Sequence, residues 1–397
     1  MSDETPGSEP TGSGDGTERV SRDAQRAANS SWKNRKIAAI VAIIAVVVLG
    51  AGAAVFALSG SEDAAPTTTK APETTTTEST TTTVPAPVGP IAPLTGVQLA
   101  NDDAAGAALL NRPAAVVKID NAPAAMPQIG MQNADVVFEI KVEGISRYMS
   151  VFHSKDVGDA GPVRSARTSD PDLLGMFVRP IVAWSGGNAN VSAVMNDTPW
   201  IQSLNHTQGE PAYHRDRSRS APHNLIVNLP RLWEFADQPP ALPTPVFGYL
   251  AEGQDPGGLT VWGLDVRVGD SPASFAWDPA SGTWLRWSNG RRQMDENGTQ
   301  IAPRNVVVLE TAYVASSADA RSPEAVTIGN GNAWVFTNGR VIAGRWERGA
   351  PEQPYALTTP EGLPMLLTPG QTFVELPETG VAPALLDEAG AAALLAT

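Results

Sequence analysis

The chain has 397 residues, no cysteine, and 42 acidic against 28 basic side chains, which gives a formal net charge of −14. Without cysteine it cannot form disulfides, use a catalytic thiolate, bind metal through cysteine, or carry a lipid on an N-terminal cysteine. The acidic balance, together with the extracytoplasmic location predicted below, excludes nucleic acid as a partner.

The N-terminal part predicts a membrane anchor. Residues 1–36 are polar and predict a disordered cytoplasmic segment. The stretch from Ile37 to Leu58 is free of charge and, at about 1.5 Å per residue, long enough to cross a bilayer as one helix. Basic residues precede it and acidic residues follow it, so the N-terminus is expected inside and everything after residue 60 outside. The alternative is a signal peptide cleaved after Val55-Phe56-Ala57.

A Thr/Pro-rich stretch follows, and a folded domain comes after it. Residues 59–95 predict an extended, disordered stalk that holds the folded part away from the membrane. Residues 96–237 alternate between strand and helix patterns and predict an α/β sandwich domain. Its expected strands are Ala114–Asp120, a half-buried Asp135–Glu143, Arg147–Phe152 and Pro180–Trp184, and its expected helices are Asp170–Phe177 and Ala189–Met195.

The C-terminal part predicts mainly strands. Residues 238–258 are dense in Pro and Gly and indicate a linker, and residues 259–377 predict a sandwich or barrel. Asn289-Gly290 and Asn338-Gly339 each follow an alternating run, which is typical of a hairpin turn. The fold class is therefore α+β, an α/β domain followed by a mainly β domain and a tail at 378–397. Leu376 to Gly380 resembles a sortase sorting signal, but no basic tail follows, so we interpret it as a chance match.

Two arginine-rich blocks, at residues 161–167 and 213–224, stand out in this acidic chain. A guanidinium group presents a planar fork of donors that fits phosphate or carboxylate in two places. We therefore predict an anion site, although a general preference for Arg over Lys would also produce such blocks. The candidate anion-binding residues are Arg147, Arg164, Arg167, Arg215, Arg217, Arg219, His223 and Asn224.

Carboxylates near these blocks raise a second possibility. Asp120, Glu139 and Glu143 would support acid/base catalysis together with His223 if they line one cleft. The alternative is a solvated strand face neutralised by basic neighbours, with His223 as a structural loop residue. The four histidines match no metal-binding signature, and we predict neither a metal nor a cofactor.

Several blocks of the sequence resemble the DUF3048 proteins, a bacterial family of unknown function divided into an N-terminal and a C-terminal domain. The resemblance lies in segments such as Ile119-Asp120-Asn121-Ala122-Pro123, Ala134 to Glu139, Gly161 to Arg167, and Arg219 to Leu225, and it continues to about residue 377. Two departures are Met126, where the family tends to have Arg, and Trp184-Ser185, where it tends to have His. The resemblance implies the two-domain division but no reaction.

These observations favour one functional hypothesis and leave two others open. The first is a membrane-anchored, extracytoplasmic envelope protein that binds an anionic cell-wall component or an envelope protein through an arginine-rich cleft. The second is an envelope hydrolase or transferase that uses the Asp, Glu and His residues beside those arginines. A structural interaction domain with no small ligand is the third.

Overall fold

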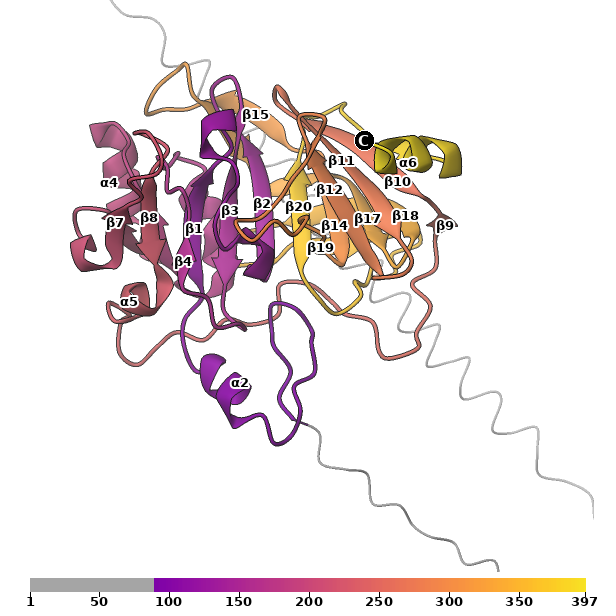
Figure 1. Cartoon of the computed structure of the whole chain (residues 1–397), viewed down its shortest axis with the longest axis horizontal. Coiled ribbons are helices and arrows are strands. Elements are labelled where there is room, and N and C mark those ends of the chain that lie inside the picture. The colour runs from indigo at the N-terminus through magenta and orange to yellow at the C-terminus, as the bar shows by residue number, and fades with distance from the viewer. Residues whose placement is uncertain (1–88) are drawn as a thin grey trace, which may run out of the picture. The chain divides into compact units, whose positions relative to one another are not determined.

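The structure is a computed structural model that describes residues 89–397 (Figure 1). Most of the predicted N-terminal features, including the membrane span at 37–58, lie outside this range. Within residues 89–397, no helix is both long and apolar enough to cross a bilayer. This part of the chain forms one compact unit and is α+β, rich in strands with few helices.

One mixed sheet of eleven strands runs through the described part of the chain. Its parallel pairs are β1 with β5, β5 with β6, β14 with β20, and β2 with β20. The strand order is β19 (Ala356–Thr358), β18 (Arg340–Arg348), β17 (Gly329–Thr337), β14 (Asn305–Leu309), β20 (Thr372–Leu376), β2 (Val136–Lys141), β3 (Ser146–Phe152), β1 (Ala115–Asp120), β5 (Ile181–Trp184) and β6 (Gln202–Asn205), and β9 (Leu259–Thr260) pairs with β18.

Smaller sheets and short helices surround this large sheet. The smaller sheets are β13 (Arg291–Arg292), β12 (Thr283–Ser288), β11 (Ser271–Asp278), β10 (Gly263–Val268) and β21 (Ala384–Leu386); β4 (Asp159–Ala160), β8 (Leu225–Asn228) and β7 (Tyr213–Arg215); and β15 (Ala312–Ala315) with β16 (Pro323–Val326). The helices are α2 (Ala104–Leu109), α3 (Asp170–Leu174), α4 (Ala189–Asp197), α5 (Leu229–Trp233) and α6 (Glu388–Leu395), with single 3₁₀ turns at Pro123–Ala125, Met131–Asn133, Gly175–Phe177 and Glu210–Ala212.

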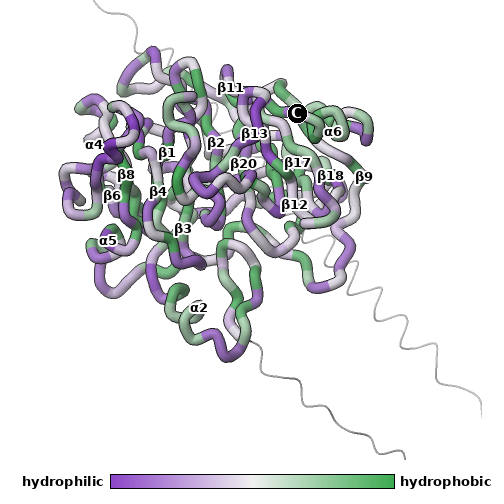
Figure 2. Tube along the Cα trace, in the orientation of Figure 1, coloured by the Kyte–Doolittle hydropathy of each residue, from purple (hydrophilic) through white to green (hydrophobic). Residues whose placement is uncertain are grey.

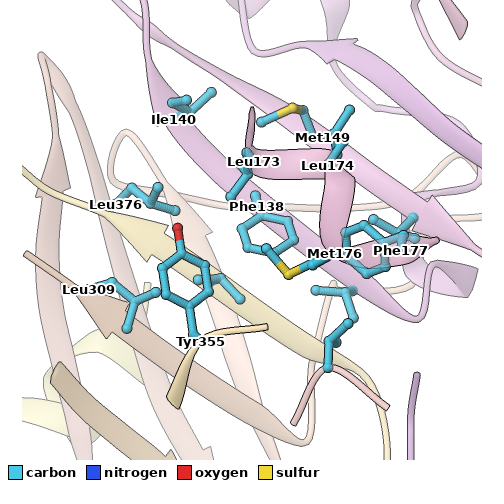
Figure 3. Close-up of a cluster of buried hydrophobic side chains, with 14 of the residues drawn as sticks. Phe138, Ile140, Met149, Leu173, Leu174, Met176, Phe177, Leu309, Tyr355 and Leu376 are labelled. Atoms are coloured by element: carbon cyan, nitrogen blue, oxygen red, sulfur yellow. The ribbon is translucent and has the colours of Figure 1, made fainter. Parts of the chain in front are cut away.

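The large sheet is buried on both faces. One core joins β2 to side chains of α3 and α4 and to the C-terminal half of the chain. Figure 3 shows Phe138 of β2 in this cluster with Leu173 and Leu174 of α3, and with Leu309 and Leu376 from the C-terminal half. The other core joins β1, β2 and β3 to β8, α5 and the five-stranded sheet. Figure 2 also shows the hydrophobic character of the C-terminal helix α6, which packs on β10 and β11. Burial on two faces fits the apolar runs of the central strands, and charged side chains that they carry, such as Lys118 and Glu139, are buried in ion pairs.

The strands predicted from the sequence are present, but β2 differs in burial. The alternating pattern predicted a half-buried strand, whereas five of its six residues are buried. The face that carries Glu139 is covered by the five-stranded sheet, which the local pattern of β2 cannot reveal. The Asn-Gly turns are confirmed: Asn338 has φ of 47° and Gly339 of 70°, and they join β17 to β18.

The predicted stalk end, linker and tail contribute to the packed structure. Leu94 is fully buried, and Val246 and Phe247 of the Pro-rich segment belong to the core beneath α3. The C-terminal segment adds β21 to the five-stranded sheet and then forms α6. Leu376, in the stretch that resembles a sorting signal, is a buried strand residue. These segments look polar or flexible in sequence because each buries only a few apolar side chains.

Candidate functional site

The first arginine block crosses the edge of the large sheet where the parallel strands β1 and β5 end. The Arg164 N–H donates to the carbonyl of Lys118 at 2.8 Å, and the Ser185 N–H donates to the carbonyl of Arg164 at 2.9 Å. The Ala166 N–H donates to the carbonyl of Gly186 at 3.2 Å. Backbone bonds therefore hold residues 164–166 against the carboxyl ends of two parallel strands, which is the usual place for ligand sites in such sheets.

Asp120, the last residue of β1, organises this edge. Its carboxylate is fully buried and accepts a hydrogen bond from the Ala122 N–H at 3.0 Å. The Nδ1 atom of His223 lies 2.7 Å from its Oδ2 atom, and the Nε atom of Arg164 lies 3.0 Å from the same oxygen. The Arg164 contact is an ion pair rather than a directed hydrogen bond. The sequence placed Asp120 and His223 in one hypothetical site, and the structure brings them into contact.

The second arginine block lies mostly in the loop between β7 and β8, and its side chains hold that loop. Arg219 pairs with Asp216 at 3.0 Å and donates to the carbonyls of Ala125 and Pro127 at 2.9 and 2.7 Å. Arg215 donates to the Oδ1 atom of the buried Asn224 at 2.8 Å. Three of the predicted anion-binding residues, Arg215, Arg219 and Asn224, therefore have their polar groups engaged in positioning the loop that carries His223.

Arg217 differs from its neighbours in that block. It is exposed and makes no ion pair or hydrogen bond with any residue in the range 89–397. His214, in the same segment, lies 3.4 Å from Asp159. The arginines of the block are thus divided: Arg215 and Arg219 make contacts that hold the loop, whereas Arg217 makes none in the described part of the chain. Sequence spacing does not reveal this division.

Arg147, Arg164 and Arg167 form a second grouping, on the face of the large sheet covered by α3 and α4. Arg147 is opposite Asp120 in the β1–β3 register and is only 6% exposed. It donates to the Ser165 carbonyl at 2.8 Å, and its Nε atom has no partner in the described part of the chain. Burial, followed by repulsion from Arg167 and Arg164, lowers the pKa of Arg147 to about 10, so it stays charged at neutral pH.

Arg167 and Glu143 line the same pocket. Arg167 donates from Nε to Glu143 at 2.9 Å and forms a second contact through Nη2, and the Ser322 hydroxyl also donates to Glu143. Partial burial opposes ionisation, but these hydrogen bonds lower the pKa of Glu143 to about 2. The pocket has a volume of about 550 Å³ and is lined by Glu143, Ser165, Arg167, Gly187, Asn188, Val191, Asp319, Arg321 and Ser322.

A buried ion pair beneath the cluster was missed by sequence reasoning. The Nζ atom of Lys118 lies 2.7 Å from Asp170 of α3, and both side chains are 2% exposed. Lys118 is the one basic residue of the otherwise apolar run at residues 115–119. A charged residue in a buried strand needs a partner of opposite charge, and this was the only signal in the sequence for the ion pair. Burial is the main cause that lowers the pKa of Lys118 to about 8, with Arg147 and Arg167 contributing. The cluster holds four cations, Lys118, Arg147, Arg164 and Arg167, against three carboxylates, Asp120, Glu143 and Asp170.

Glu139 does not belong to this site, contrary to the hypothesis that it shares a cleft with Arg147. In the β2–β3 register Glu139 is opposite Tyr148, so its side chain points to the other face of the sheet. There it forms an ion pair with Arg286, which also lies 3.4 Å from Glu375. All three side chains are at most 1% exposed. Burial and repulsion from Glu139 raise the pKa of Glu375 well above its ordinary value.

Comparisons with known proteins match both halves of the chain. The model for the N-terminal domain of a protein of unknown function (DUF3048) matches residues 94–241, and the model for its C-terminal domain matches residues 264–374. The chain belongs to the DUF3048 family. Strands from both matched segments pair within one sheet, because β2 pairs with β20 and β20 with β14.

One curated relative is named "Putative lipoprotein YerB", from Bacillus subtilis strain 168. The two sequences are 26% identical over 304 residues, which cover 72% of this chain and 85% of the relative. The crystal structure of the YerB protein from Bacillus subtilis aligns with a TM-score of 0.64 and 21% identity, over 75% of this chain and 99% of that one. This similarity shows that the two chains share a fold.

The two departures from the family pattern lie in different surroundings. Trp184 is 1% exposed, and its Nε1 atom donates to Ser203 at 3.0 Å, so its side chain belongs to the core. Met126 lines a second pocket, of about 600 Å³, together with Arg291 and Arg292 from the C-terminal half. The side chains of Trp184 and Met126 take no part in the cluster around Asp120 and Arg147, whereas the Ser185 N–H donates to the carbonyl of Arg164 at 2.9 Å.

Proposed function

We propose that this protein is an extracytoplasmic envelope protein, anchored by residues 37–58, that binds an anionic cell-wall component or envelope partner at the carboxyl edge of β1 and β5. Its similarity to a protein named as a lipoprotein supports a place at the membrane surface. The charged segments that flank residues 37–58 support an extracytoplasmic location for residues 89–397.

Arg147 is the observation that carries the binding proposal. It is a buried cation whose hydrogen bond goes to a backbone carbonyl, and the nearest carboxylates, Asp120 and Glu143, already pair with Arg164 and Arg167. An uncompensated buried charge is costly, and two neighbouring guanidinium groups increase that cost. A bound anion would offset the repulsion among the three arginines. The proposal therefore assigns binding to Arg147, Arg164 and Arg167, with Arg217 as an exposed outer contact.

The binding experiment uses the full chain in detergent, with poly(glycerol phosphate) and polyglutamate as anionic probes and dextran as a neutral one. A charge-assisted hydrogen bond contributes about 1.5–3 kcal/mol, so Arg147→Met and Arg164→Lys should each weaken binding about tenfold or more. The Lys variant keeps the charge but loses the planar fork. Arg267→Met, at an exposed position on β10, is the matched control and should change binding little.

Salt dependence separates this site from general charge attraction. Contacts within a partly buried cluster are screened less than contacts between exposed charges. Binding to the edge should therefore persist between 50 and 300 mM salt in the wild type and be lost in Arg147→Met. Equal binding by the wild type and both arginine variants, or no binding to either anionic polymer, would overturn the proposal.

Topology is tested separately from binding. A tag placed at each end should show, when intact spheroplasts are treated with protease, loss of the C-terminal tag alone. Survival of the C-terminal tag together with loss of the N-terminal tag would invert the orientation and exclude a wall ligand.

A further inference from the structure

We propose that His223, oriented by Asp120, acts as a general base that hydrolyses phosphodiester bonds in an anionic polymer held by Arg164. This inference rests on the proposed anion binding and names the class of ligand and the reaction. It is carried by the geometry around one buried carboxylate oxygen, the Oδ2 atom of Asp120, which both His223 and Arg164 contact.

Asp120 fixes the orientation of the imidazole ring. Its carboxylate is a hydrogen-bond acceptor, so the Nδ1 atom of His223 carries the proton that they share at 2.7 Å. The Nε2 atom of the neutral ring then holds a free electron pair. Nε2 has no partner within residues 89–397 and is not buried, since the His223 side chain is 20% exposed. A carboxylate-oriented imidazole with its other nitrogen open to solvent is the arrangement that general bases use.

Arg164 supplies an anion contact beside that nitrogen. Its Nε atom faces Asp120, while its two terminal nitrogens make no hydrogen bond with any residue in the range 89–397 and are not buried. Because Arg164 and His223 contact the same oxygen, at 3.0 and 2.7 Å, the Nε atom of Arg164 and the Nδ1 atom of His223 are less than about 6 Å apart. The proposal places an anionic group bound by the terminal nitrogens of Arg164 next to Nε2.

The positions of the carboxylates favour phosphodiesters over glycosides. A glycoside hydrolase usually needs two carboxyl groups that flank the scissile bond. Here Asp120 is buried behind His223, Glu139 points to the other face of the sheet, and Glu143 is occupied by Arg167 and Ser322. In a phosphodiester polymer, the charged group that an arginine binds is also the group that is cleaved. Binding at Arg164 therefore places phosphorus itself beside the base.

The reaction is a hydrolysis that consumes one water molecule. Nε2 of His223 accepts a proton from water while the water oxygen bonds to phosphorus, and the ester P–O bond breaks. The departing alkoxide takes a proton from a second water molecule, and the imidazolium returns its proton to the hydroxide that is left. The products are an alcohol and a phosphomonoester. Arg164 stabilises the negative charge that grows on the non-bridging oxygens in the transition state.

The test uses the full chain in detergent with bis(4-nitrophenyl) phosphate and poly(glycerol phosphate) as substrates, and 4-nitrophenyl phosphate as a monoester control. The wild type should release 4-nitrophenol from the diester and create phosphomonoester ends in the polymer. His223→Ala should lower turnover about 10²- to 10⁴-fold, while binding of poly(glycerol phosphate) changes little. His214→Gln, the matched control in the same segment, pairs with Asp159 and should keep wild-type turnover.

Chemical rescue separates catalysis from a structural role of His223. Added imidazole should restore turnover in His223→Ala and leave its melting temperature unchanged, whereas loss of a structural contact would not be rescued in this way. Binding without turnover by the wild type, or turnover that survives His223→Ala, would overturn the catalytic inference and leave the binding proposal standing. Absence of binding to poly(glycerol phosphate) would overturn the binding proposal itself.

Discussion

Glu139 and Glu375 both lie beside Arg286, on the face of the large sheet opposite to Arg147. Substituting these two carboxyl groups tests which of them carries the charge that balances Arg286. Burial and repulsion from Glu139 raise the pKa of Glu375, so the folded protein keeps this proton to a higher pH than the unfolded chain does. A raised folded-state pKa gives stability that is complete below about pH 4.5 and is lost as the pH rises through the folded value. Glu375→Gln should therefore stabilise the protein at pH 7 and matter less at pH 4.5.

Glu139→Gln should act differently, because it removes the carboxylate that forms the ion pair with Arg286. Glu375 lies 3.4 Å from the same guanidinium group and can ionise to replace it, so the single variant should lose only part of the pair's stability. The double variant leaves a fully buried cation without a carboxylate and should lose about 3–5 kcal/mol. The two substitutions should therefore be strongly non-additive.

Urea unfolding followed by tryptophan fluorescence measures these differences at both pH values. Glu347→Gln, at an exposed position on β18, is the control and should change the free energy of unfolding by no more than about 0.5 kcal/mol. If Glu375→Gln destabilises the protein at pH 7 as much as Glu139→Gln does, or if the two effects add, then both carboxyl groups carry charge and the reasoning is refuted.

Three further predictions concern stability. A chain ending at residue 241 should lack a cooperative unfolding transition, because β2 would lose its partner β20; a sharp transition would show that the first half folds alone. The lowered pKa of Lys118 means that between about pH 8 and 10.5 the unfolded chain holds this proton more than the folded protein does, so the contribution of Lys118 to stability rises over this range. In a pH series of urea midpoints, the wild type should therefore gain stability relative to Lys118→Met as the pH is raised, and a constant difference would contradict the prediction. Gly339→Ala should lower the melting temperature more than Gly298→Ala. Both glycines have positive φ, but a Cβ at position 339 would lie 2.8 Å from Trp277, while a Cβ at position 298 would meet no atom within 4 Å. Equal losses of melting temperature would exclude the contact with Trp277 as the cause.

Local sequence patterns were sufficient to predict several strands and to group Asp120 with His223, which are in contact in the structure. Apolar runs and alternation located β1, β3, β5 and the β17–β18 hairpin, because these signals depend only on neighbouring residues. The sequence also grouped Asp120 with His223 and singled out Arg164. It did so because Asp120 ends an apolar run and His223 follows Pro222 in a rigid loop, and such positions often carry functional residues.

Tertiary structure decided which charged residues meet and which are separated. Strand pairing puts Arg147 and Asp120 on one face of the sheet and Glu139 on the other, although Glu139 and Arg147 are close in sequence. Arg286, which pairs with Glu139, and Ser322, which donates to Glu143, come from the C-terminal half, more than 140 residues along the chain. Long-range pairing of this kind depends on β2 joining β20 across two sequence segments, and no local pattern encodes it.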